Sequence, residues 1–273
     1  MKNPFSPEYR HISIIAFISF LVIYSSSFIS GYGYFIDEFY YIACANNPAF
    51  GYVDHPPFAP LFLTAYKFIF GESLYAIRFI PALTASVTVF LTGIITKQFG
   101  GNKISQTIAS FCVFVSPLFA TLGSFYSMNV FEPMFCTIVF YLFIKMINEK
   151  NPVIWIYIGI LFGLLLLNKH TAGLFIVFVI ISMVITEHRK LLFTKYFVYS
   201  VVITTLIFLP NIIWQIKSGF PSLEFYITNI TRKNIPMPAI EYLIFNVFAY
   251  NPFVFLLSIT GAVFLIYVSY KHL

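Results

Sequence analysis

Charged side chains are scarce in this chain of 273 residues. Only 10% of the residues are Asp, Glu, Lys or Arg, and 59% are hydrophobic, whereas a soluble domain has roughly 25% charged residues and about half apolar ones. The mean hydropathy is +0.86. This composition excludes a soluble globular fold and indicates a chain whose core lies within a lipid bilayer.

Cysteines and basic runs are few as well. Cys44, Cys112 and Cys136 are odd in number, far apart and embedded in apolar sequence, which argues against a disulfide framework or a paired-cysteine metal site. The formal net charge is +6, but no basic run is longer than His188-Arg189-Lys190. A nucleic-acid partner is therefore not expected, and the single charges between apolar segments are interpreted as topology signals.

Apolar segments close to the length of a membrane span make up most of the chain. Eight candidates are separated by polar residues or by Gly and Pro: 12–31, 74–96, 105–122, 130–147, 153–168, 171–186, 196–213 and 240–268. We therefore expect an all-α polytopic membrane protein of about eight transmembrane helices, forming one domain over residues 1–273. The short segments 153–168 and 171–186 are predicted to form either a tight helical hairpin or one broken helix.

The first span and the loop after it need separate interpretation. The apolar run of residues 12–30 follows Lys2 and Arg10, but it is longer than the core of a signal peptide and lacks a clear cleavage site. It is interpreted as an uncleaved first span. The loop over residues 32–73 contains the apolar segment 58–70, which is too short to span and is predicted to be an interfacial helix.

Basic residues indicate the orientation of the chain. If the amino terminus is cytoplasmic and each segment crosses once, ten of the sixteen Lys and Arg residues lie inside: Lys2, Arg10, Lys97, Lys103, Lys145, Lys150, Arg189, Lys190, Lys195 and Lys271. Most acids then lie at the outer ends: Asp37, Glu38, Asp54, Glu72, Glu132, Glu224 and Glu241. This positive-inside bias predicts that the loop 32–73 is on the non-cytoplasmic side.

That first loop holds the densest group of polar residues. Asp37 and Glu38 closely follow the outer end of the first span, where a carboxylate can serve as a general base or a cation ligand. Alternatively, the two acids cap a helix that starts at residue 38. Asp54 and His55 precede Pro56 and Pro57, which stiffen the chain. This pair is either a solvated loop pair or a site for cation ligation or catalysis.

These residues carry a resemblance to a known family. The segments Asp37–Ala45 and Gly51–Pro57 resemble the first periplasmic loop of bacterial members of the protein mannosyltransferase family, which include the aminoarabinose transferase of lipid A. The similarity continues, in order, through Ser127–Glu132, Asn168–Thr171, Leu209–Gln215, Pro221–Glu224 and the pair Asn251-Pro252. Asn129 stands where many relatives have aspartate, so the second acid is expected to be Glu132.

The resemblance implies a glycosyltransferase of the C-fold. Such an enzyme moves a hexosyl or pentosyl group from a polyprenyl phosphate to a lipid, glycan or protein acceptor, normally with inversion, outside the cytoplasm of a bacterial inner membrane. Asp37 is the implied base, and Glu38, Asp54 and His55 are the residues implied to support it. Glu132 is the second acid, or simply an acid at the start of a helix.

Basic and aromatic residues fill the remaining implied roles. Lys169 and His170 are the first candidates to bind the departing phosphate, although Lys169 can also extend to the lipid headgroups. Arg232 and Lys233 are second-rank phosphate candidates or a solvated pair. The aromatic residues are explained by an interfacial belt, and four of them can also stack on a sugar: Tyr40, Tyr41, Tyr52 and Trp214.

The chain is shorter than such enzymes usually are. It is interpreted as a natural short form, as one piece of a split gene whose carboxyl-terminal half a separate chain supplies, or as a noncatalytic remnant. A transporter or flippase is the rival function, with Asp37, Glu132 and Lys169 forming a polar pathway.

Overall fold

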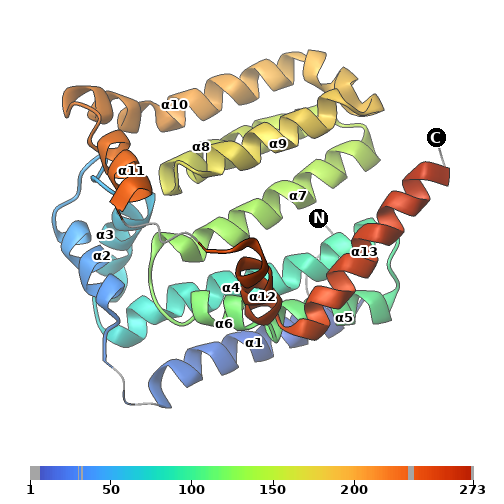
Figure 1. Cartoon of the computed structure of the whole chain (residues 1–273), viewed down its shortest axis with the longest axis horizontal. Coiled ribbons are helices and arrows are strands. Elements are labelled where there is room, and N and C mark those ends of the chain that lie inside the picture. Colours follow the sequence, from blue (N-terminus) through green and yellow to red (C-terminus); the bar gives the residue numbers. More distant parts are fainter. Residues whose placement is uncertain (1–6, 30, 32, 233–236, 272–273) are drawn as a thin grey trace.

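The computed structural model describes residues 7–29, 31, 33–232 and 237–271, and within these residues the regular structure is helical throughout. Long helices stack side by side, and their shorter connections gather at the ends (Figure 1). The amino-terminal half contains α1 (Arg10–Ile29), α2 (Ile36–Asn46), α3 (Phe58–Phe70), α4 (Leu74–Gln98), α5 (Lys103–Phe114), α6 (Pro117–Leu122), η1 (Met128–Val130) and α7 (Phe131–Glu149). The remainder contains η2 (Pro152–Ile154), α8 (Trp155–Asn168), α9 (Ala172–Val184), η3 (Glu187–Phe193), α10 (Lys195–Lys217), α11 (Pro221–Arg232), α12 (Ala239–Tyr250) and α13 (Pro252–Lys271).

The helices make this a polytopic membrane protein, with fewer complete spans than the eight predicted. Among the described residues, four helices are long and apolar enough to cross a bilayer: α1, α4, α10 and the continuous run of η1 and α7. The number rises to six if each of two bent pairs forms one span, namely α9 with η3 and α12 with α13. Several predicted spans are therefore short or broken helices.

Two segments that were predicted as single spans are not continuous helices, and each is interrupted next to a proline. The segment 105–122 divides into α5 and α6, because Pro117 has no backbone N–H and begins the new helix. The segment 240–268 bends by 103° between α12 and α13. Asn251 there has a positive φ of 77°, and Pro252 begins α13.

The two short segments form the hairpin that was one of the two predicted alternatives. In Figure 1, α9 returns alongside α8 from the turn at Lys169 and His170. The far end of the hairpin is closed by Trp155, whose indole Nε1 donates to the carbonyl of Leu191 at 3.1 Å. Trp155 is fully buried there.

Close packing of α8 on α10 depends on two glycines one helical turn apart. A Cβ atom on Gly159 would lie 2.6 Å from the backbone oxygen of Ser200, and one on Gly163 would lie 2.7 Å from Ile207 Cβ. The hydroxyl of Thr204 donates across the contact to the Gly159 carbonyl at 2.9 Å. Small residues spaced in this way let two helix backbones approach closely inside a membrane.

The first loop folds largely as expected. The helix predicted over 58–70 is α3. A second short helix, α2, begins at Ile36, two residues before the predicted start. Together with α11, these helices lie at one end of the bundle, on the left in Figure 1. We call this the loop end, and the turn between α8 and α9 reaches the same end.

Candidate functional site

Asp37 and Glu38 lie in the first turn of α2 but have different surroundings. Glu38 is fully buried, and its Oε2 accepts a hydrogen bond from the backbone N–H of Phe35 at 2.8 Å. The predicted capping role is thus confirmed for Glu38. Asp37 is partly exposed, and no described residue donates a hydrogen bond to its carboxylate or pairs with it. Of the two acids, Asp37 is the one free to meet a ligand.

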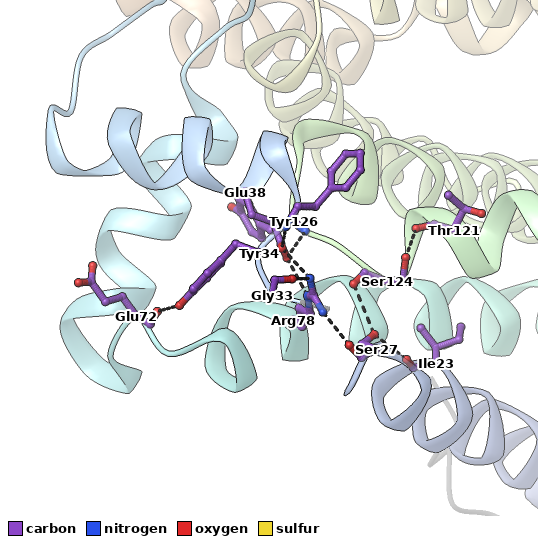
Figure 2. Close-up of polar contacts among 11 residues, drawn as sticks. Ile23, Ser27, Gly33, Tyr34, Glu38, Glu72, Arg78, Thr121, Ser124 and Tyr126 are labelled. Carbon is purple, nitrogen blue, oxygen red and sulfur yellow. Dashed lines mark hydrogen bonds and ion pairs between the residues drawn. The ribbon is translucent and has the colours of Figure 1, made fainter. Parts of the chain in front are cut away.

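Glu38 is held by an arginine from α4 (Figure 2). The guanidinium of Arg78 donates through Nε to Glu38 Oε1 at 3.1 Å and through Nη2 to Oε2 at 2.9 Å. Arg78 is 4% exposed, so the pair is buried on both sides. Removing one partner of such a pair leaves an uncompensated buried charge.

Asp54 and His55 form a compact group with three tyrosines. The hydroxyl of Tyr40 donates to Asp54 Oδ1 at 2.5 Å. The His55 ring stacks on Tyr41, with ring centroids 5.0 Å apart, and contacts Tyr52 at the same centroid separation. His55 is 1% exposed. It is therefore a buried side chain rather than the solvated loop residue that was one of its two interpretations.

The hydrogen bonds of His55 leave one ring nitrogen open. Its Nδ1 lies 2.8 Å from the Pro56 carbonyl, which only accepts, so Nδ1 carries the proton. The other nitrogen, Nε2, is buried without a hydrogen-bond partner, and it lies 3.9 Å from Asp54 Oδ1. Two acceptors face each other there, an arrangement suited to a hydroxyl donor or a cation.

The segment before α7 and the α8–α9 turn meet at the loop end. Lys169 Nζ donates to Glu132 Oε2 at 2.9 Å and to Asn129 Oδ1 at 3.1 Å. Both members of the ion pair are partly exposed, Lys169 at 29% and Glu132 at 27% of the side chain. Asn168, next to Lys169, donates through Nδ2 to the Met128 carbonyl at 2.9 Å. The turn thus presents an accessible cation beside an acid.

His170 connects the same turn to α10 and α11. Its Nε2 lies 3.0 Å from Asn211 Oδ1, and its Nδ1 lies 2.9 Å from the hydroxyl of Tyr226. Asn211 Nδ2 in turn donates to the carbonyl of Phe50 in the first loop at 2.8 Å. A cavity of about 290 Å³ opens beside His170, between α10 and α11. His170 is thus held by α10 and α11, and Asn211 connects it indirectly to the first loop.

Burial lowers the pKa of both His55 and His170 below the ordinary value of 6.5. Because the folded-state pKa is lower, the unfolded chain binds more protons below pH 6.5, and the free energy of unfolding must fall as the pH decreases. We expect the thermal unfolding midpoint to fall between pH 7 and pH 5, and to fall less in a His55→Gln variant. A midpoint equally sensitive to acid in that variant would contradict a contribution from His55.

The aromatic candidates are placed as follows. Tyr41 is 4% exposed and Tyr40 is 41% exposed. The Tyr52 hydroxyl donates to the Cys44 carbonyl at 2.9 Å. Trp214 packs against the first loop, since a Cβ on Gly51 would lie 2.2 Å from the indole ring. Tyr40 is thus the most exposed of the three tyrosines, while Trp214 joins α10 to the loop.

The remaining candidates are the basic pair Arg232 and Lys233 and a bound divalent metal ion. Arg232 is the last residue of α11, and Lys233 lies outside the described residues. Among the described residues, no three His, Cys, Asp or Glu side chains lie close enough together to hold a metal ion. A cation at Asp54 and His55 would need further ligands from a substrate or from water.

Three contributors to this region were missed from the sequence. Arg78 and Asn211 stand alone within apolar runs, and Tyr226 lies in the segment between the predicted spans 196–213 and 240–268. A charged or amide side chain within a membrane span needs a partner, and that rule marks Arg78 and Asn211 as residues to examine. It does not identify the partners, which are about 40 and 160 residues away in the chain.

Comparison with known proteins agrees with this picture. A family model described as dolichyl-phosphate-mannose-protein mannosyltransferase matches residues 54–214, more than half of the chain. The match begins at Asp54 and includes Glu132, Lys169 and His170. No curated protein and no solved structure matches the chain significantly. The chain therefore belongs to the dolichyl-phosphate-mannose-protein mannosyltransferase family.

Proposed function

We propose that this membrane glycosyltransferase takes a hexosyl or pentosyl group from a polyprenyl phosphate and transfers it to a lipid, glycan or protein acceptor at the loop end. We place that end on the non-cytoplasmic side of a bacterial inner membrane, because positive charge is concentrated at the opposite ends of the predicted spans. The observation that carries the proposal is the meeting of the Lys169–Glu132 pair and the first loop at one end of the bundle.

At the anomeric carbon, the reaction forms one bond and breaks one. An acceptor hydroxyl attacks the anomeric carbon, the bond from that carbon to the phosphate oxygen breaks, and the hydroxyl proton passes to Asp37. Inversion follows from attack on the face opposite the leaving group. Asp37 fits the role of base because its carboxylate has no partner among the described residues. Glu38 contributes by holding α2 in place rather than by touching the substrate.

The departing polyprenyl phosphate needs a cation. Lys169 suits this role, since it is partly exposed and lies in a turn that two short helices hold at the loop end. A phosphate would compete with Glu132 for the ammonium group, and positive charge placed where negative charge develops lowers the barrier. His170 lies next in the chain, beside the cavity between α10 and α11, which we assign to the portion of the donor next to the phosphate.

In this proposal, the Asp54–His55 pair helps to bind the acceptor. The open Nε2 of His55 and the carboxylate of Asp54 can accept hydrogen bonds from a sugar or an acceptor, or bind a divalent cation that the substrate helps to ligate. Tyr40, the most exposed of the three loop tyrosines, offers a ring face for stacking. Arg232 and Lys233 stay candidates for a second phosphate contact.

A transfer assay with a lysine variant tests the proposal. Purified protein in lipid vesicles is incubated with radiolabelled polyprenyl-phosphate sugars and candidate acceptors, and transferred label is counted. We expect Lys169→Met to lower the rate by about 10²-fold, and Lys169→Arg to keep part of it.

Lys67→Met is the matched control, because Lys67 is also at the loop end and pairs with Glu72 at 2.5 Å. The control should transfer like the wild type. Equal rates in Lys169→Met and the wild type would overturn the role of Lys169. No release of sugar from any donor would overturn the proposed function itself.

A further inference from the structure

Arg78 is a buried cation that the proposed chemistry does not use. It lies in the second turn of α4, and its guanidinium points at the start of α2 (Figure 2). The contact with Glu38 is bidentate, at 3.1 and 2.9 Å. A forked contact of this kind fixes orientation as well as distance, so Arg78 constrains how the first turn of α2 sits on the bundle.

The same guanidinium also holds the chain that precedes α2. Its Nη1 donates to the carbonyl of Ser27 at 2.7 Å, and its Nη2 donates to the carbonyl of Gly33 at 2.7 Å. Ser27 is in the last turn of α1, where carbonyls lack partners within the helix. One side chain of α4 therefore joins the end of the first span to the start of the loop helix.

Glu38 extends these contacts to a further segment. Its Oε1 also accepts a hydrogen bond from the backbone N–H of Tyr126 at 3.2 Å. Tyr126 is fully buried and precedes η1 and the first turn of α7, which carries Glu132. The Arg78–Glu38 pair thus lies between the segment with Asp37 and the segment with Glu132.

We propose that Arg78 is a positioning residue for the transfer reaction: its forked contact with Glu38 sets the place of Asp37, and its charge offsets that of Glu38 beside Asp37. This inference rests on the proposed function of Asp37 as the base. A lysine in place of Arg78 would keep the charge but lose the bidentate contact, because an ammonium group has one nitrogen and lacks the rigid, planar pair of N–H donors of a guanidinium. Position and charge can therefore be tested separately.

The neighbouring titratable groups do not obscure such a test. Tyr34 interacts electrostatically with Glu38, Glu72 and Arg78, and burial raises its pKa. Tyr41 interacts with Asp37 and Asp54, and burial raises its pKa as well. Both phenols therefore stay neutral at neutral and acidic pH, where a carboxylate base loses activity.

The first test separates the effect of the bidentate contact from the effect of the charge. In Arg78→Lys we expect kcat to fall by about 10²-fold, since small displacements of a catalytic group have effects of that order. The KM for the donor should not change, because the donor contacts lie on α8 to α11. An Arg78→Lys variant with wild-type kcat would overturn the positioning role.

The second test measures the effect of the Arg78 and Glu38 charges on the pH–rate profile. Glu38→Gln leaves the Arg78 cation unpaired beside the base, so the acidic limb of the kcat/KM profile should move to lower pH. The double variant Glu38→Gln/Arg78→Gln removes both charges, and its limb should return to the wild-type position while kcat stays low. A limb that does not move in Glu38→Gln, or that moves equally in the double variant, would overturn the charge role.

A third measurement does not depend on activity. Hydrogen–deuterium exchange should be faster in Arg78→Lys and in the double variant for peptides covering residues 33–41 and 124–131. Arg189→Lys is the matched control, since Arg189 is exposed on η3, and its exchange should equal that of the wild type. Unchanged exchange in Arg78→Lys would overturn the inference even if the variant is inactive.

The two proposals can fail separately. If Asp37→Asn transfers sugar like the wild type, the assigned base is wrong, whereas faster exchange in Arg78→Lys would still show that the pair positions α2. If Asp37→Asn is inactive but Arg78→Lys matches the wild type in kcat and exchange, only the role of Arg78 is overturned.

Discussion

Asp37→Asn is expected to lower the rate of sugar transfer by about 10²- to 10⁴-fold, the usual contribution of a general base. Asparagine has nearly the shape of aspartate but cannot take the proton of the acceptor hydroxyl. The substitution should leave the fold intact, because the Asp37 carboxylate has no hydrogen bond or ion pair with a described residue. The loss of an acid from a helix first turn costs only about 0.3–1 kcal/mol.

The measurement is the initial rate of transfer from a labelled polyprenyl-phosphate sugar, divided by the amount of folded protein. Glu224→Gln is the matched control, because Glu224 is an exposed acid in the first turn of α11, also at the loop end. It should retain wild-type activity. A rate for Asp37→Asn equal to that of the control would remove Asp37 from the mechanism.

Gly159→Ala is expected to destabilise the packing of α8 on α10. The added Cβ would lie 2.6 Å from the Ser200 carbonyl oxygen and 2.7 Å from its Cα, both backbone atoms that cannot rotate away. The helices α8 and α10 must then separate. Overpacking of this kind costs about 1–3 kcal/mol, and separation would also weaken the Thr204 hydrogen bond to Gly159.

Gly173→Ala provides the comparison, since Gly173 is in α9 and its added Cβ would meet Leu166 Cδ2 at an ordinary 3.8 Å. Alanine is the better helix former, so this variant should unfold at the same temperature as the wild type or slightly higher. Thermal unfolding in detergent gives both midpoints. Equal midpoints for the two variants would show that α8 and α10 have room to relax.

Helix formation was predictable from local sequence, while the continuity of the helices was less so. Hydropathy located α1, α4 and α10, and the short apolar segment 58–70 was correctly interpreted as α3. The breaks before Pro117 and Pro252 were missed because hydropathy does not register a missing backbone N–H. A proline within an apolar run was the available signal, although Pro81 and Pro210 lie inside continuous helices.

The placement of Lys169 and Glu132 at the same side of the bundle was predictable from the sequence, but the pairings between side chains were not. Lys169 and Glu132 were both expected at the outer ends of spans, but their ion pair depends on how α7 meets the α8–α9 turn. Glu38 was predicted to act together with Asp37. Only the packing of α4 shows that its carboxylate is paired with Arg78. Partners so distant along the chain are set by tertiary packing, which single-sequence patterns do not record.

Two hydrogen bonds at the loop end join residues that are far apart in the chain. Asn211 meets the Phe50 carbonyl across 161 positions, and the Ser222 hydroxyl donates to the Tyr52 carbonyl across 170. During synthesis, α1, α2 and α4 can therefore join through Arg78 long before the stretch around Phe50 and Tyr52 acquires its partners. The contacts of Arg78 thus need only the first hundred residues, whereas those of Asn211 and Ser222 need α10 and α11 to have been synthesised.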